Sequence, residues 1–309
     1  MIRRLWKESA PLTGCCLVLI AVFLASAIGI FADPRTITGV PAWLKPAKFA
    51  LSGVIFTSTL AWMFQYLPAW PRLKRITGWT IAIVFLLEIG LIDLQAARGT
   101  TSHFNAGTGF DAAVFSIMGV AIALLWIASA AIAYALFRQP FANRDWGWSL
   151  RLGALIYVIG AAAGGFMLGP TAEQRAALAA HEKVATIGAH TVGAPDGGPG
   201  IPGVGWSLHH GDLRIPHFFG LHALQIIPFL GWLIVRNHKS ARLVFSAAAS
   251  YVAFVGILAW QALRGQSILE PDPATLTAFG IWAAATLVIV IWSGKGSEQY
   301  DSGTAVLSV

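Results

Sequence analysis

The chain has 309 residues, of which 56% are hydrophobic and 11% are charged, and its mean hydropathy is +0.67. Soluble domains usually carry about 25% charged residues. Too few polar side chains are present to cover a soluble protein of this size, so the composition predicts an integral membrane protein whose first partner is the lipid bilayer. The net charge of +7 fits basic residues on cytoplasmic loops and does not indicate a nucleic-acid partner.

Apolar stretches long enough to cross a bilayer recur along the whole chain. A spanning helix needs about 20 apolar residues, and its backbone polar groups must be paired within the segment. The expected fold class is therefore all-α, a polytopic membrane protein of about eight transmembrane helices. The predicted spans are 12–32, 47–67, 78–97, 110–137, 149–169, 216–235, 243–263 and 274–293.

The basic residues are divided unevenly between the two sides that these spans define. Thirteen of the 21 lysines and arginines lie at the termini or near the connections after spans two, four and six, with only four acidic residues. The other side holds eight basic and ten acidic residues. Because basic loops stay in the cytoplasm, both termini are predicted to be cytoplasmic, in a bacterial-type inner (plasma) membrane.

Two sequence patterns occur twice, four spans apart. Span three ends in Gln-Ala-Ala-Arg-Gly at 95–99, and span seven ends in Gln-Ala-Leu-Arg-Gly at 261–265. Spans two and six each follow a leucine, a basic residue and a proline, at 44–46 and 213–216. These repeats favour a parallel duplication of a four-helix unit, with a site at the interface between the units. A snorkelling arginine before a helix-ending glycine is the alternative explanation of the first pattern.

The two units would be residues 1–145 and residues 146–309, the second including an extracytoplasmic loop at 170–215.

That long loop carries two further signals. Thr171 to Gln174 has the pattern of a capping box and predicts a short helix. Residues 191–205 contain too many glycines and prolines for regular structure. Long loops of this kind are often lids or binding loops, and a simple tether is the alternative.

Four histidines fall within fourteen residues at the start of span six, and they are candidate metal ligands because a neutral imidazole offers a nitrogen lone pair. Haem b or a transition metal is the candidate cofactor. His217 and His222 lie about 140° apart around a helix, so a partner from elsewhere is needed, and His103 after span three is the candidate. Gln225, one turn after His222, joins the cofactor-binding candidates. The four histidines are His209, His210, His217 and His222.

Span three carries Glu88 and Asp93 inside an apolar run. Ionisable groups in a membrane are costly and by default indicate function, so both are candidate catalytic residues. For Asp93, an ion pair with Arg98 is the alternative. Glu88 is expected to be a proton carrier, a metal ligand or the partner of a basic residue. The basic candidates, also counted as cofactor-binding residues, are Lys45, Lys48, Arg98 and Arg264.

These candidates are predicted to meet in one outer-leaflet cavity, with His103, His217 and His222 on its walls, Glu88 at its floor and the Gly/Pro stretch above. Metal or haem ligation, polar lining of a ligand cavity and structural hydrogen bonding between helices are three alternative roles for the histidines. A transporter should carry polar residues at both ends of its spans, so their concentration on one side favours an enzyme or ligand-binding protein.

Three functional hypotheses follow from this pattern, and the sequence leaves open whether the chain is an enzyme. The first is a membrane-embedded oxidoreductase or metal- or haem-binding protein that acts on a lipid-soluble substrate such as a quinone. The second is a transporter or channel for a small solute or protons, built from parallel repeats. The third, a sensor or assembly subunit, has no positive support.

Overall fold

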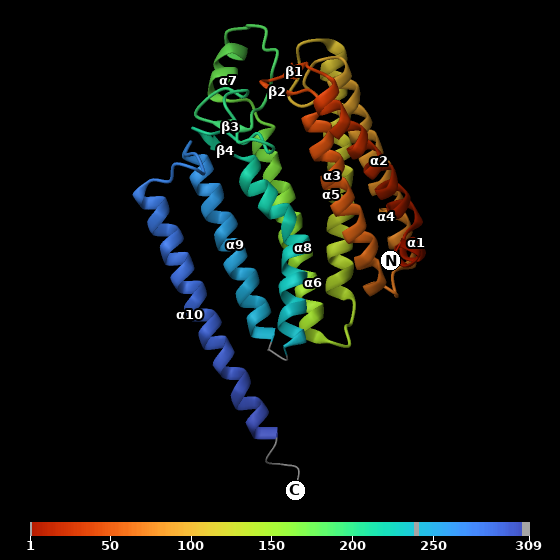
Figure 1. Cartoon of the computed structure of the whole chain (residues 1–309), viewed down its shortest axis with the longest axis vertical. Helices are drawn as coiled ribbons and strands as arrows, with labels where there is room; N and C mark the ends of the chain where they lie inside the picture. The colour runs from red at the N-terminus through yellow and green to blue at the C-terminus, as the bar shows by residue number, and fades with distance from the viewer. Residues whose placement is uncertain (1, 238–240, 305–309) are drawn as a thin grey trace.

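The computed structural model describes residues 2–237 and 241–304, which form ten α-helices and four two-residue strands (Figure 1). Part of the basic cluster around 236–242 lies outside the described residues. The helices are α1 (Ile2–Glu8), α2 (Ala10–Ala32), α3 (Leu44–Met63), α4 (Pro71–Ala97), α5 (Gly109–Arg138), α6 (Arg144–Ala163), α7 (Ala172–Ala179), α8 (Arg214–Arg236), α9 (Ala241–Leu263) and α10 (Pro273–Thr304). The strands are β1 (Thr36–Ile37), β2 (Val40–Pro41), β3 (Thr191–Val192) and β4 (Gly211–Asp212).

Eight of the described helices are long and apolar enough to cross a membrane, so the predicted all-α polytopic fold is confirmed. Their boundaries follow local sequence signals. Ser9 caps α2 by accepting the backbone N–H of Leu12, and Thr108 caps α5 in the same way. Thr171 and Gln174 form the predicted capping box at the start of α7.

The helices lie side by side, and the four strands and α7 gather at one end of the bundle, while α1 and the last turns of α10 lie toward the opposite end (Figure 1). We call this the cap end. Strands β1 and β2 form an antiparallel pair between α2 and α3. Strands β3 and β4, also antiparallel, lie within the long connection between α6 and α8.

The first four spanning helices and the last four show the same packing pattern. Helix α2 makes its most extensive contact with α3, as α6 does with α8, and α4 packs against α5 as α9 packs against α10. At the cap end, Gln95 donates to the carbonyl of Thr101, and Gln261 donates to the carbonyl of Ser267. A duplication requires such correspondences, and superposition of the two halves stays a prediction.

The two halves meet where α5 packs against α6 and along a second junction, which we call the seam, where side chains of α3 reach α6 and α8. Phe56 of α3 stacks on Tyr157 of α6 with ring centroids 5.1 Å apart. Further along α3, Thr59 accepts a hydrogen bond of 3.1 Å from Gln225 of α8. Buried leucines, alanines and aromatic residues from α3, α5, α6 and α8 fill the rest of this core.

Candidate functional site

Three cations meet at the cap end of the seam. Lys45 and Lys48 lie in the first turns of α3, and Arg214 is the first residue of α8. The charges of Lys48 and Arg214 are both close enough to act on Lys45. We call these three residues the cationic cluster, which joins basic side chains from both halves.

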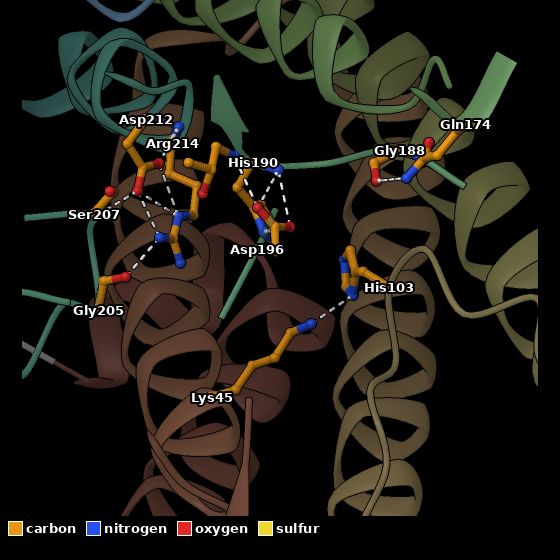
Figure 2. Close-up of polar contacts among 11 residues, drawn as sticks. Lys45, His103, Gln174, Gly188, His190, Asp196, Gly205, Ser207, Asp212 and Arg214 are labelled. Carbon is orange, nitrogen blue, oxygen red and sulfur yellow. Dashed lines mark hydrogen bonds and ion pairs between the residues drawn. The ribbon is translucent and has the colours of Figure 1, made fainter. Parts of the chain in front are cut away.

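Each member of the cationic cluster donates to an uncharged acceptor. Lys45 Nζ lies 3.0 Å from His103 Nδ1 (Figure 2). Lys48 Nζ donates to the carbonyl of Val204 at 2.7 Å, and Arg214 donates to the carbonyl of Gly205 at 2.6 Å. Arg214 also forms an ion pair with Asp212. The cluster therefore ties the predicted Gly/Pro loop, residues 191–205, to the ends of α3 and α8.

His103 is held in its neutral form. Burial lowers its pKa well below the ordinary value, and the charges of Lys45 and His190 lower it further. A neutral ring with Nδ1 facing an ammonium group accepts at that nitrogen and keeps its proton on Nε2. The ring packs against Phe49 and Phe104, so its position is fixed by aromatic contacts as well as by Lys45.

A second histidine, His190, packs its ring against Phe104 with centroids 4.8 Å apart and is paired with Asp196 of the Gly/Pro loop. Its Nδ1 lies 2.8 Å from an Asp196 carboxylate oxygen (Figure 2), and the backbone N–H groups of His190 and Thr191 donate to the same carboxylate. Burial lowers the pKa of His190, an effect that Asp196 opposes. Burial also raises the pKa of Asp196, but these hydrogen bonds outweigh it and bring that pKa below its usual range.

Glu88 lies within the membrane beneath this cluster. Only 4% of the surface of Glu88 is exposed, and its Oε1 has no hydrogen-bond partner among the described residues. Lys45 is close enough for its charge to act on the carboxyl group of Glu88. Asp93 likewise has one buried carboxylate oxygen without a partner in the described part of the chain. Of the expected partners of Glu88, the structure therefore places only Lys45 in electrostatic contact with it.

The other two basic candidates are occupied elsewhere at the cap end. Arg98 forms an ion pair of 2.7 Å with Asp111 of α5. Arg264 forms an ion pair with Asp272, which precedes α10. Both arginines therefore brace helix connections, in corresponding places of the two halves.

The histidines at the start of span six are divided among separate contacts. His217 Nδ1 lies 2.9 Å from the carbonyl of Gly160 in α6, and the ring of His222 packs on Phe218. His209 is exposed and lies 3.6 Å from Glu270. The backbone N–H of His210 donates to Ser207. Gln225 binds Thr59 across the seam and keeps one buried oxygen without a partner among the described residues.

Metal ligation gains no support from this distribution. Among the side chains that the structure describes, in residues 2–237 and 242–292, no group of three or more His, Cys, Asp and Glu is arranged to hold a metal ion. The haem and metal hypotheses therefore still rest on the sequence pattern alone.

A separate apolar cavity of about 560 Å³ lies on the other side of α8, where α8, α9 and α10 surround it. Its walls are mostly aliphatic and aromatic side chains. The cavity borders no member of the cationic cluster. Its polar wall atoms include Ser250, which hydrogen-bonds Thr286 and Trp282.

Comparison with protein-family models, with curated proteins and with solved structures finds no match to this chain. The site must therefore be interpreted from its own geometry.

Sequence reasoning identified Lys45, Lys48, His103 and Glu88 but missed the contributions of the second half. It gave no role to His190, Asp196, Asp212 or Arg214, which complete the cluster around the Gly/Pro loop. The sequence did hold one signal for Asp212 and Arg214, because an aspartate two residues before an arginine also occurs at Asp33 and Arg35. In the structure both pairs make the same bidentate contact. No local signal marks the pairing of His190 with Asp196, which depends on how the loop folds back.

Proposed function

We propose that the chain is a proton-coupled membrane transporter for a small solute, with the solute site in the seam and Glu88 as the proton carrier. The observation that supports this most directly is the buried carboxyl of Glu88, which has an unpartnered oxygen and lies within reach of the charge of Lys45. A carboxylate buried without compensation is very costly. Glu88 is therefore stable either with a proton or with a cation as its neighbour, and transport needs both states.

The position of the cluster supports the same interpretation. In transporters built from repeats, substrate and coupling ion lie between the repeats. Lys45 and Lys48 come from the first half, and Arg214 from the second. The Gly/Pro loop covers them and is held by Val204 and Gly205. Opening this loop would expose the cluster to one side of a bacterial-type inner membrane, with both termini on the cytoplasmic side as the charge distribution indicates.

Proton movement in proteoliposomes tests the proposal. Addition of small solutes to vesicles that contain the full chain and a pH-sensitive dye should cause solute-dependent proton uptake. Glu88→Gln should abolish that uptake because the amide cannot carry a proton. Glu182→Gln removes an exposed carboxyl and should leave uptake unchanged. Undiminished uptake in folded Glu88→Gln would contradict the proposed role of Glu88.

The oxidoreductase hypothesis is the second candidate, and the apolar cavity favours it. A cavity of about 560 Å³ is of the size that holds a small molecule, and its walls belong to spanning helices, as a lipid-soluble substrate requires. An absorption spectrum and metal analysis of the purified protein distinguish the candidates. Stoichiometric haem or metal would support the oxidoreductase, and a colourless, metal-free protein that is active in vesicles would exclude a haem or metal mechanism.

A further inference from the structure

We infer that the cationic cluster binds a small oxyanion, carboxylate or phosphate, and that this anion binds together with a proton on Glu88. The inference deepens the proposed function by naming the class of solute. Its claim that anion and proton are transported together rests on that proposed function. Anion binding itself can be measured without any transport.

The first argument is the charge balance of the cluster. Within the described residues, neither Lys45 nor Lys48 forms an ion pair with a carboxylate, and each has one neutral acceptor, His103 or Val204. An ammonium group carries three N–H donors, so both lysines keep donors to offer. An ammonium group already makes a charge-assisted bond to a carbonyl oxygen, and an oxyanion adds the attraction between two full opposite charges. An oxyanion is therefore a better partner for these lysines than a backbone carbonyl.

The helix ends at the cluster are the second argument. Four described spanning helices begin at the cap end, and those away from the seam are capped by side chains, α5 by Thr108 and α10 by Asp272. The N-cap residues of α3 and α8, Trp43 and Leu213, supply no side-chain capping hydrogen bond to their helices. Asp212 accepts the first N–H of α8. The partial positive charge of helix N-termini favours anions, and here it adds to three basic side chains.

The buried carboxyl of Glu88 supplies an independent third observation. Glu88 is 4% exposed and keeps an unpartnered oxygen within the described chain, and Lys45 is the cation that acts on it. An ionised Glu88 and a bound anion would share the single charge of Lys45. Protonation of Glu88 releases Lys45 for the anion, so anion and proton bind together and can be carried together in one direction.

The groups around Lys45 set the sign of the pH dependence. Lys48 on α3, Arg214 on α8, Glu88 on α4 and Asp196 of the Gly/Pro loop all act on Lys45, and His103 contacts it directly. His103 and His190 have lowered pKa values and stay neutral above about pH 6.5. Between pH 8 and 6.5, protonation of Glu88, and of Lys45 or Lys48 where either has lost its proton, makes the site more positive, so anion affinity should rise as the pH falls.

Entry of the anion requires that the Gly/Pro loop leave its carbonyl contacts. Lys48 would exchange the oxygen of Val204 for an oxygen of the anion, and Arg214 would exchange that of Gly205 while it keeps Asp212. The loop is thus a competitor of the ligand, and its release accompanies binding.

Titration calorimetry on the full chain in nanodiscs tests the inference, with acetate, succinate and inorganic phosphate as probes and chloride as reference. At least one oxyanion should bind saturably, and comparison of the three distinguishes carboxylate from phosphate. Lys45→Met and Lys48→Met should each weaken binding at least tenfold. Lys45→Arg should bind more tightly than Lys45→Met, and Lys183→Met, at an exposed lysine, should be unchanged. Melting curves identify any variant that fails to fold.

The pH arm separates this inference from the proposed function. Wild-type affinity should rise from pH 8 to 6.5, while Glu88→Gln should bind more tightly than wild type at pH 8 and show a smaller rise. No saturable binding of any oxyanion, or equal binding by folded Lys45→Met and Lys48→Met, overturns the anion site even if solute-dependent proton uptake is observed. Oxyanion binding without any proton uptake leaves the anion site in place and overturns the transporter.

Discussion

The two halves of the bundle share a packing plan and differ in what they place inside it. If Gln95 is matched with Gln261, the position of Glu88 in α4 corresponds to that of Phe254 in α9. Glu88 lies near Lys45, whereas Phe254 packs among aromatic rings that include Phe219 and Trp282. The first half therefore holds the buried charge and the second holds an apolar cavity. The comparison teaches that two halves with a similar packing pattern can contribute different residues to a site, a buried carboxyl from one half and apolar side chains from the other.

The connections at the cap end differ in the same complementary way. The first half joins α2 to α3 through residues 33–43, with only the β1–β2 pair. The second half inserts residues 168–213 between α6 and α8, including α7, β3 and β4. That insertion supplies the loop held by Lys48 of the first half. The tip of the first hairpin also approaches it, since a Cβ added to Gly39 would lie 3.5 Å from the carbonyl oxygen of Gly197.

The largest stability difference between the halves should come from their main helix crossings. In the second half, a Cβ added to Gly160 would lie 2.4 Å from the Cα of Gly220, so α6 and α8 would have to separate. In the first half, a Cβ added to Gly53 would lie 2.7 Å from Leu19 Cδ1, the end of a flexible side chain. We expect Gly160→Ala to cost about 3 kcal/mol and Gly53→Ala about 1 kcal/mol, the two ends of the usual range for overpacking.

Thermal melting of the two alanine variants in one detergent measures this difference. Both substitutions replace a helical glycine, so the intrinsic gain in helix propensity is the same and cancels in the comparison. Equal melting temperatures for the two variants would show that the α6–α8 backbone contact is not closer than the α2–α3 contact.

The spans were predictable because hydropathy alone determines them, and their observed ends agree with the prediction within several residues. The site was only partly predictable. A lysine or carboxyl in an apolar run, such as Lys45 or Glu88, is visible in the sequence because its burial is costly. The histidine pattern at span six suggested one cluster, yet His217 binds the carbonyl of Gly160. Which partner a histidine finds depends on helix rotation and loop folding, and sequence spacing encodes neither.

A smaller difference is expected between the two arginines that brace corresponding connections. Asp111, the partner of Arg98, has a side chain that is 7% exposed, whereas Asp272, the partner of Arg264, is 31% exposed. Removing a cation from a buried carboxylate costs more than removing it from a hydrated one. Arg98→Met should therefore lower the melting temperature clearly more than Arg264→Met.

A second substitution checks that reason. Asp111→Asn in the Arg98→Met background should recover part of the lost melting temperature, because it removes the unpaired charge while Gln95 and Thr108 stay as hydrogen-bond neighbours. The corresponding change Asp272→Asn in Arg264→Met should recover little. A larger loss of melting temperature for Arg264→Met than for Arg98→Met would contradict the order expected from the burial of Asp111 and Asp272.

A last predicted effect is a weakening of the cap as the pH falls, and it sharpens the contrast between the inserted loop and the short first hairpin. His103 and His190 have pKa values lowered chiefly by burial, so the folded cap holds them neutral. When the cap opens, both regain an ordinary pKa near about 6.5 and take up protons below it. Opening is thus favoured as the pH falls below that value, by at most about tenfold per pH unit for each histidine. Asp196 acts in the same direction at lower pH, because its pKa is lowered in the folded cap.

Limited proteolysis of the Gly/Pro loop between pH 7.5 and 5.5 measures this opening, with protease activity calibrated at each pH on an unfolded peptide. Cleavage within 191–205 should increase below about pH 6.5, and cleavage of the hairpin at 33–43, which contains no histidine, should change less. His103→Asn should flatten the pH dependence, since one of the two titrating groups is gone. A loop that becomes more resistant as the pH falls would have the wrong sign for neutral buried histidines, and would require that His103 and His190 gain their protons in the closed cap.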